Sequence, residues 1–303
     1  MKNNTPQQLH QPVLLEQVIS LLAPKKGESY LDLTAGYGGH AEAVLATTGE
    51  PKEIVLVDRD NDAIASLSSF AKRGATVMHC DFFSAAQKLH EQGRSFDMIL
   101  LDLGVSSPQL DRAERGFSFK YAGPLDMRMD ERETKTAAEL VNHASEAELV
   151  QILSQFGEEP RARRVVKAII EARPIQTTDE LATVIAQTIR RGKSKIHPAT
   201  RTFQAIRIAV NRELELLEAT LKLLPELLAP EGRVVFISFH SLEDRLVKRF
   251  LQDHSEGYEA DLKITTKKPI SGATEDVHNP RARSAKLRAA VKINMKGAHI
   301  YAH

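Results

Sequence analysis

The chain has 303 residues, of which 42% are hydrophobic and 27% are charged, and its formal net charge is +1. This balance is typical of a globular protein and excludes a highly charged disordered chain. Its single cysteine, Cys80, excludes a disulfide framework, and the absence of a signal-peptide core or a run of ~18 apolar residues predicts a cytoplasmic protein without membrane association.

Short apolar runs alternate with helical patterns over the first hundred residues. Strands are predicted at 30–33, 53–57, 75–79 and 96–101. Helices are predicted at 13–22, 39–47, 61–72 and 83–92, with Asn61 as the N-cap of the third. Such alternation predicts an α/β fold with a parallel, doubly wound sheet and right-handed crossovers.

After Leu103 the pattern changes to a loop-rich segment and then to helices alone. Helices are predicted at 136–142, 145–155, 161–172, 178–190 and 199–227, two of them opened by capping boxes at 145–148 and 177–180. Strand character returns at 233–239, followed by a helix at 242–253 and a strand pair within 257–295. We therefore expect a sheet domain formed by residues 1–112 and 229–303, interrupted by a helical insertion over 113–228.

A glycine-rich loop follows the first predicted strand and opens the next helix. Its glycines allow close approach of a ligand to the backbone, and Asp58, 22 residues after Gly36, is placed to accept ribose hydroxyls. The spacing Gly36-x-Gly38-x-x-Ala41 fits a dinucleotide, whereas Asp32-x-Thr34-x-Gly36-x-Gly38 resembles the methyltransferase pattern. A carboxylate at Asp32 would repel a pyrophosphate but suits the amino-acid end of S-adenosylmethionine, which favours a methyl donor.

The fourth predicted strand ends in Asp102, and a polar loop follows it. Asp102 is a candidate acceptor for the N–H groups of an exocyclic aromatic amine, with Ser106 and Ser107 as further catalytic candidates. The alternative is that this cluster serves only as a turn or helix cap. His240 follows the fifth predicted strand, where it either contacts the target nucleotide or has a structural role.

Several longer blocks resemble one known family, the bacterial ribosomal RNA small-subunit methyltransferase H family, over nearly the whole chain. The matching blocks are residues 38–40, 102–119, 123–130, 197–205, 237–245 and 279–284. The segment 255–278 is shorter than the corresponding segment of many family members, and its sequence is more divergent. The residues from about Ala289 onward match nothing in the family.

The resemblance implies a Rossmann-like class I methyltransferase with a mostly parallel, seven-stranded sheet and an all-α insertion. It also implies the donor S-adenosyl-L-methionine and N4-methylation of a decoding-site cytidine in the 16S ribosomal RNA of the small ribosomal subunit. The family's cofactor contacts fall on Gly38, Gly39, His40, Asp58, Phe83, Asp102 and Gln109. With Asp32 and Gly36 from the loop pattern, these form the expected cofactor site.

Two basic stretches are candidate RNA contacts, which the resemblance favours over ordinary solvated charge. They comprise Arg190, Arg191, Lys193, Lys195 and Arg201 in the insertion, and Arg281 and Arg283 near the end of the chain. The aromatic residues Phe117, Phe119 and Tyr121 either stack on the target base or pack beneath their loop. The histidines lack a metal-ligand spacing, so no metal site is expected.

Three other functions remain open at this point. A dinucleotide-dependent oxidoreductase is disfavoured by Asp32, and no hydride-relay site is evident near the loop. A ribosome-assembly factor that binds the donor but acts mainly by docking on RNA would share most of these features. An amino-methyltransferase acting on another nucleic acid or on a free nucleotide would share the chemistry.

Overall fold

The computed structural model describes residues 12–189 and 197–293. The chain divides into two compact units, which we call the sheet unit and the helical unit. The sheet unit contains the residues up to Gly104 and those from Leu216 onward, and the helical unit contains Val105–Glu215. Within the described ranges, no helix is both long enough and apolar enough to span a membrane.

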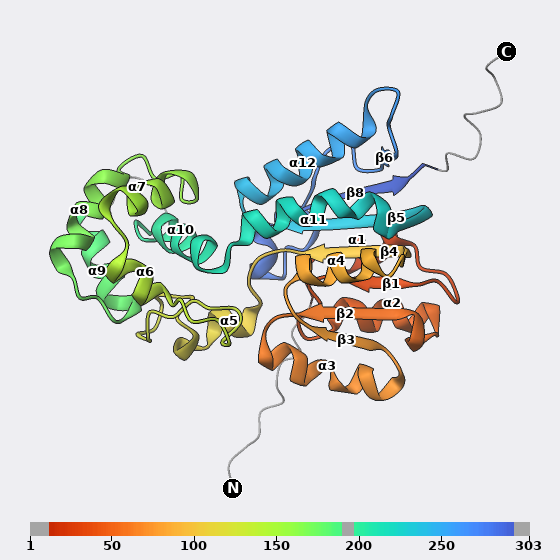
Figure 1. The fold of residues 1–303 in the computed structure, drawn as a ribbon, viewed down its shortest axis with the longest axis horizontal. Helices are drawn as coiled ribbons and strands as arrows, with labels where there is room; N and C mark the ends of the chain where they lie inside the picture. Colours follow the sequence, from red (N-terminus) through yellow and green to blue (C-terminus); the bar gives the residue numbers. More distant parts are fainter. Residues whose placement is uncertain (1–11, 190–196, 294–303) are drawn as a thin grey trace, which may run out of the picture. The chain divides into compact units, whose positions relative to one another are not determined.

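The sheet unit contains one mixed sheet (Figure 1). Its strands are β1 (Tyr30–Asp32), β2 (Ile54–Asp58), β3 (Thr76–His79), β4 (Phe96–Asp102), β5 (Leu228–Ser238), β6 (Leu262–Ile264), β7 (Ile270–Ser271) and β8 (Lys286–Lys292). Strands β1 to β5 pair in parallel, whereas β8 is antiparallel to β5, β6 and β7. Seven strands follow the order β3-β2-β1-β4-β5-β8-β6, and the two-residue β7 adds an eighth to the expected seven.

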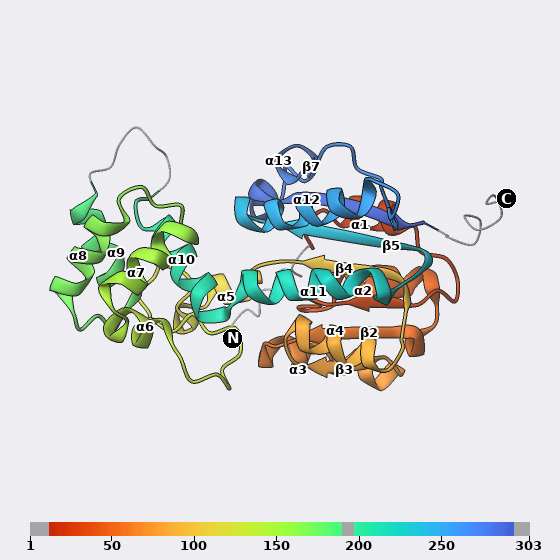
Figure 2. The same ribbon diagram turned by 45° about the horizontal axis from the view of Figure 1, so that its top comes forward.

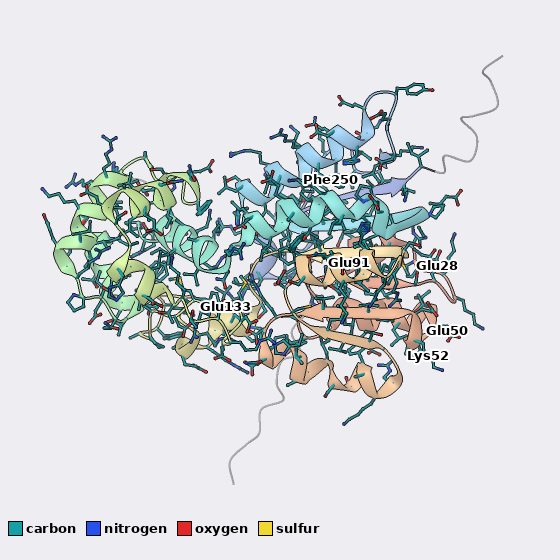
Figure 3. All side chains as sticks on the ribbon, in the orientation of Figure 1. Glu28, Glu50, Lys52, Glu91, Glu133 and Phe250 are labelled. Carbon is teal, nitrogen blue, oxygen red and sulfur yellow. The ribbon has the colours of Figure 1, made fainter. Side chains whose placement is uncertain are left out.

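Helices cover both faces of this sheet (Figure 2). They are α1 (Leu15–Leu22), α2 (Gly39–Thr48), α3 (Asn61–Arg73), α4 (Phe82–Glu91), α11 (Glu213–Leu227), α12 (Ser241–Ser255) and the short α13 (Gly272–Glu275). Alternate residues of one strand enter different cores, since Leu31 packs with α4, α11 and α12 while Tyr30 packs with α1, α2 and α3. On the first face, Phe250 of α12 (Figure 3) meets Phe236 of β5 edge-on, with the ring centroids 6.1 Å apart.

The strand order reverses at β1, which lies between β2 and β4. In open α/β sheets the ligand crevice lies beyond the carboxyl ends of the strands at such a switch point. Asp32 ends β1 and Asp102 ends β4, with Asp32 paired in register with Leu100 and Asp102 with Ile237 of β5. The topology therefore gathers the ends of β1, β2, β4 and β5 at one edge.

The helical unit has its own hydrophobic core. Its helices are α5 (Ser107–Asp111), α6 (Ala137–His143), α7 (Glu146–Gln155), α8 (Ala162–Ala172), α9 (Thr178–Thr188) and α10 (Thr200–Asn211). Each of the longer helices buries an apolar stripe, as Leu149, Val165 and Ile185 show, all with no exposed surface. Ser145 and Thr177 cap α7 and α9 as predicted, the latter in a complete capping box.

Three details differ from the expectations. The long helix expected over 199–227 is two helices, because Arg212 adopts a left-handed conformation with φ 51° between α10 and α11. Asp60, not Asn61, caps α3, because its side chain accepts the N–H of Asp62. The helical unit contains residues 105–215, whereas the expected insertion was 113–228. Its second boundary lies before α11 because Leu217 and Leu224 of that helix pack in a core of the sheet unit.

Candidate active site

Three carboxyl groups lie at the ends of neighbouring parallel strands: Asp32, Asp58 and Asp102. Asp32 is buried, with 1% of its surface exposed, and the other two are half-buried. Burial is the largest cause of a raised pKa in each of them. This edge of the sheet therefore concentrates acidic groups whose ionisation is opposed by burial.

Asp32 is held from both sides of its carboxyl group. The hydroxyl of Tyr30 donates to Oδ2 at 2.8 Å, and the N–H of Thr34 donates to Oδ1 at 3.2 Å. Burial raises the pKa of Asp32 to about 7, although both hydrogen bonds act in the opposite direction. Burial together with the charge of Asp32 also raises the pKa of the Tyr30 hydroxyl well above its ordinary value.

Asp58 fixes the glycine-rich loop against the end of β2. The N–H of Gly36 donates to Oδ2 at 2.8 Å, and the N–H of Asp60 donates to Oδ1 at 2.9 Å. Each carboxylate oxygen has two lone pairs, so these bonds leave acceptor capacity for ligand hydroxyls. The residue expected to bind a ribose thus also sets the position of the loop.

Asp102 has one carboxyl oxygen without a partner. Its backbone N–H donates to Thr34 Oγ1 at 2.5 Å, which ties the end of β4 to the glycine loop. Oδ2 lies 3.9 Å from Nδ1 of His40, whose Nε2 lies 3.1 Å from the carbonyl oxygen of Val13. Oδ1 is buried and accepts no hydrogen bond. After burial, the charges of Asp32 and Glu243 raise the pKa of Asp102 further.

The glycines of the loop meet different constraints. A Cβ at Gly38, where φ is +82°, would lie 2.5 Å from the ring of Phe70. A Cβ at Gly39 would lie 2.3 Å from Cγ of Pro12, whereas at Gly36, with φ +52°, the nearest atom would be 4.0 Å away. Packing within the sheet unit therefore requires Gly38 and Gly39, and backbone conformation favours glycine at Gly36.

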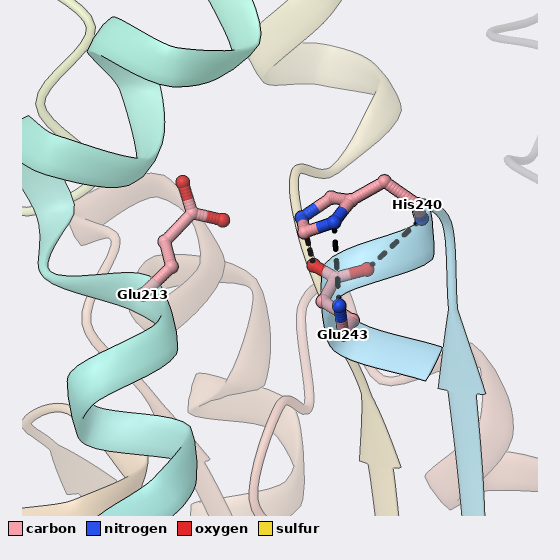
Figure 4. A group of neighbouring side chains, drawn as sticks. All are labelled: Glu213, His240 and Glu243. Carbon is pink, nitrogen blue, oxygen red and sulfur yellow. Dashed lines mark hydrogen bonds and ion pairs between the residues drawn. The ribbon is translucent and has the colours of Figure 1, made fainter. Parts of the chain in front are cut away.

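His240 is the N-cap of α12 and forms a reciprocal capping box with Glu243 (Figure 4). The N–H of Glu243 donates to Nδ1 of His240 at 3.3 Å. In return, Oε2 of Glu243 accepts the N–H groups of Phe239 at 2.8 Å and His240 at 3.2 Å. The side chain of Glu243 is 2% exposed, so the pair is buried at the start of α12, directly after β5.

The other predicted site residues occupy two helix starts. In the helical unit, Ser106 and Gln109 form the capping box that opens α5, and Ser107 and Gln109 are buried. Ser106 is therefore a helix cap, which is the structural alternative that the sequence left open beside a catalytic role. In the sheet unit, Phe83 is half-buried in the first turn of α4, where its N–H donates to Oδ1 of Asp81 at 2.9 Å.

The three aromatic residues of the loop after α5 differ in exposure. Phe117 is buried in the core of the helical unit, and the ring of Phe119 packs against those of His197 and Phe203 at 4.7 and 4.8 Å. Tyr121 is 56% exposed, and Nζ of Lys120 lies 5.2 Å from its ring centroid. Tyr121 is therefore the only one of the three with most of its surface open to a ligand.

Some of the expected RNA contacts can be located. Arg190, Arg191, Lys193 and Lys195 lie outside the described residues. Arg201 is exposed and donates to the carbonyl oxygen of Glu158 at 3.1 Å, and Arg283 is exposed whereas Arg281 is half-buried.

Sequence reasoning did not assign Tyr30 or Glu243 to the site. Tyr30 and Asp32 are two residues apart on a strand and so face the same side, which was a usable signal. His240 and Glu243 have the three-residue spacing of a capping box before an apolar run, although histidine is an uncommon cap. The hydrogen bond between Thr34 and Asp102 joins positions 68 residues apart and had no such local signal.

Residues 7–293 match the model of the MraW methylase family. The ribosomal RNA small subunit methyltransferase H of Cyanothece sp. is 48% identical over 292 residues, covering 95% of this chain and 96% of that protein. The proteins of the same name from Acidobacterium capsulatum and Nitrosococcus oceani are 46% and 44% identical, each covering 93% of this chain and 98% and 96% of their own lengths. The similarity thus extends over almost the full length of each relative.

Proposed function

The chain belongs to the MraW methylase family, and we propose that it methylates the 16S ribosomal RNA of the small ribosomal subunit. The proposed target atom is N4 of a decoding-site cytidine. The observation that carries the proposal is the identity of 44–48% to relatives named ribosomal RNA small subunit methyltransferase H, over at least 93% of this chain. A substrate in the small ribosomal subunit supports a cytoplasmic location for the protein.

The acidic edge of the sheet fits S-adenosylmethionine, which carries a positive sulfonium and an ammonium group. Burial opposes ionisation of Asp32, Asp58 and Asp102, and a cationic ligand would favour their charged forms. The unpartnered Oδ1 of Asp102 offers an acceptor to such a ligand or to its reaction partner. A dinucleotide would instead bring its negative pyrophosphate to this acidic edge.

When bound, S-adenosylmethionine supplies the methyl group and leaves as S-adenosylhomocysteine. The cytosine amino nitrogen is a weak nucleophile because its lone pair is delocalised into the ring. Asp102 accepts an N–H of this amine and favours the pyramidal geometry of the transition state. Thr34 fixes the backbone of Asp102, and Asp58 fixes Gly36, so the groups that orient the reactants are set before binding.

The two units have separate tasks in this proposal. The sheet unit binds the donor through Asp32, Asp58, the loop from Gly36 to His40 and Phe83. The helical unit binds RNA through Arg201 and its neighbouring basic residues, and Tyr121 offers an exposed ring for stacking. Arg281 and Arg283 of the sheet unit add phosphate contacts.

An Asp102→Ala variant separates this enzyme from a factor that acts only by docking on RNA. The variant is expected to fold with undiminished stability, because it removes a carboxyl group whose ionisation burial opposes. It should bind small ribosomal subunits as wild type does and transfer label from S-adenosylmethionine at least 100-fold more slowly, by analogy with the loss of a transition-state hydrogen bond. Transfer at the wild-type rate would show that Asp102 has no role in the chemistry.

A further inference from the structure

In the described part of the sheet unit, three buried side-chain polar atoms form no hydrogen bond, and one of them is Oγ1 of Thr48 in α2. The other two are Oδ1 of Asp102 and Nε2 of His240. They follow β4 and β5, which are neighbouring parallel strands with Asp102 in register with Ile237. Adjacent strands lie about 4.8 Å apart, so the two side chains project from the same edge of the sheet at nearby positions. Buried polar atoms are nearly always paired, and the exceptions require an explanation.

The hydrogen bonds of His240 determine which ring nitrogen carries its proton. Nδ1 accepts the N–H of Glu243, so the proton of the neutral ring is on Nε2. Nε2 lies 3.0 Å from Oε1 of Glu243 (Figure 4), but this close contact does not have the geometry of a hydrogen bond. His240 therefore holds an N–H donor in a fixed orientation with no acceptor.

We infer that Nε2 of His240 and Oδ1 of Asp102 together recognise the Watson–Crick edge of the target cytosine. This inference rests on the proposed function and assigns the residue that reads the base. Cytosine presents an amino donor, N4, beside a ring acceptor, N3. Asp102 accepts from N4, and His240 donates to N3.

The same two groups reject uracil. Uracil presents an acceptor, O4, beside a donor, N3–H. The acceptor of Asp102 would then face O4, and the donor of His240 would face N3–H. A site built to hydrogen-bond one partner discriminates strongly against an analogue that leaves its buried polar groups unpaired. Both atoms are covered in this structure, so the base reaches them after the side chains above them move aside. Binding of the cytosine then satisfies a donor and an acceptor that are otherwise buried without partners.

Two substitutions at His240 separate base recognition from helix capping. His240→Asn keeps a side-chain oxygen at the cap position, where asparagine is favoured, but removes the donor at Nε2. His240→Gln weakens the cap but places an amide N–H near the position of Nε2. A capping role predicts that the Asn variant is the more stable and the more active, whereas base recognition predicts that the Gln variant is the more active.

The experiment measures kcat/KM for methyl transfer to small ribosomal subunits that lack the modification, together with S-adenosylmethionine affinity and melting temperature for each variant. The Asn variant should bind the donor as wild type does and lose at least about tenfold in kcat/KM, with the Gln variant falling less. Any result in which the Asn variant is at least as active as the Gln variant overturns the inference. Wild type is the separate control: failure to methylate cytidine at all overturns the proposed function itself.

Discussion

At the residue scale, Asp32, Asp58 and Asp102 are carboxyl groups in surroundings that oppose their ionisation. Burying a charge without a counter-charge costs several kcal/mol even after the protein relaxes around it, and proteins usually avoid this cost by shifting the pKa of the group. The hydrogen bonds from Tyr30, Thr34 and Gly36 reduce this cost for two of the three. A positively charged ligand would offset this cost by favouring the ionised forms of the cluster.

Binding of S-adenosylmethionine is predicted to strengthen as the pH rises through about 7. Asp32, whose pKa burial raises to about 7, must lose its proton to meet a cationic ligand. In an Asp32→Asn variant this part of the pH dependence should disappear. Titration calorimetry in buffers of different ionisation enthalpy measures both the affinity and the proton released on binding.

The ligand-free protein provides the control for this prediction. The folded-state pKa of Asp32 is raised from 3.8, so its contribution to stability is fully present below that value and is lost as the pH rises through about 7. Urea denaturation of the Asp32→Asn variant should lack this decline, which amounts to a few kcal/mol at most. If donor affinity and the free energy of unfolding changed with pH in the same way in wild type and in the Asp32→Asn variant, Asp32 would not titrate in this range.

Glycine-loop spacing for Asp32, and position after a predicted strand for Asp58 and Asp102, were enough to predict that these carboxyl groups lie at the carboxyl ends of strands. Position after a strand was not enough to assign a role to His240, because that role depends on which atoms of the ring are paired. A sequence pattern gives the element on which a side chain lies. It does not show which atoms of that side chain form hydrogen bonds or how deeply those atoms are buried.

At the element scale, the turn between β1 and α2 combines backbone conformation with close packing. Gly38→Ala is predicted to destabilise the protein by about 3 kcal/mol, because the added Cβ is strained at φ +82° and meets the ring of Phe70 at 2.5 Å. Gly49→Ala, at φ +72° with nothing within 4 Å, should cost only about 1 kcal/mol. Urea denaturation of both variants gives the comparison, and equal losses would show that the contact with Phe70 is relieved by a small shift.

The first four strands were predicted within about one residue, because continuous apolar runs flanked by helical periodicity mark a buried parallel sheet. The break at Arg212 was missed, since helical periodicity continues across it and no glycine or proline marks it. The start of β5 at Leu228 was also missed, because Pro230 and Gly232 suggest a turn. Leu228 pairs with Phe96 of β4, but the register then shifts and regular pairing resumes at Arg233, so Pro230 and Gly232 lie in an irregular stretch of β5.

At the scale of the whole molecule, the net charge of +1 gives no indication of a polyanionic partner. Local surface chemistry is more informative. The backbone around Tyr121 is fixed to the start of α9, because the Thr178 hydroxyl donates to the carbonyl oxygen of Tyr121 at 3.3 Å and accepts the N–H of Gly123 at 3.2 Å. An exposed ring on a fixed backbone, with Lys120 beside it, suits a splayed nucleotide.

Tyr121→Ala is therefore predicted to raise KM for small ribosomal subunits about tenfold, the loss of one base-stacking contact. Tyr121→Phe should retain most of the affinity, since the ring provides the stacking surface. Tyr258→Ala is the matched control, because Tyr258 is fully exposed in the sheet unit and has no proposed contact with RNA. Steady-state methylation assays at saturating donor make the comparison, and equal KM values for the two alanine variants would remove Tyr121 from the RNA surface.

The presence of a helical insertion was predictable because strand patterns stop after Leu103 and return only near residue 233. Its limits were not, since α11 continues the helical pattern while its leucines pack in the sheet unit. Helical periodicity shows that a face is buried, but it does not show which core buries it.

The most direct test of the proposed function is to identify the nucleoside that receives the methyl group. Wild-type protein is incubated with labelled S-adenosylmethionine and small ribosomal subunits lacking the modification, and the RNA is digested and separated into nucleosides. The account predicts that the label is recovered in N4-methylcytidine. Label in any other nucleoside, or no transfer although the donor binds, would contradict it.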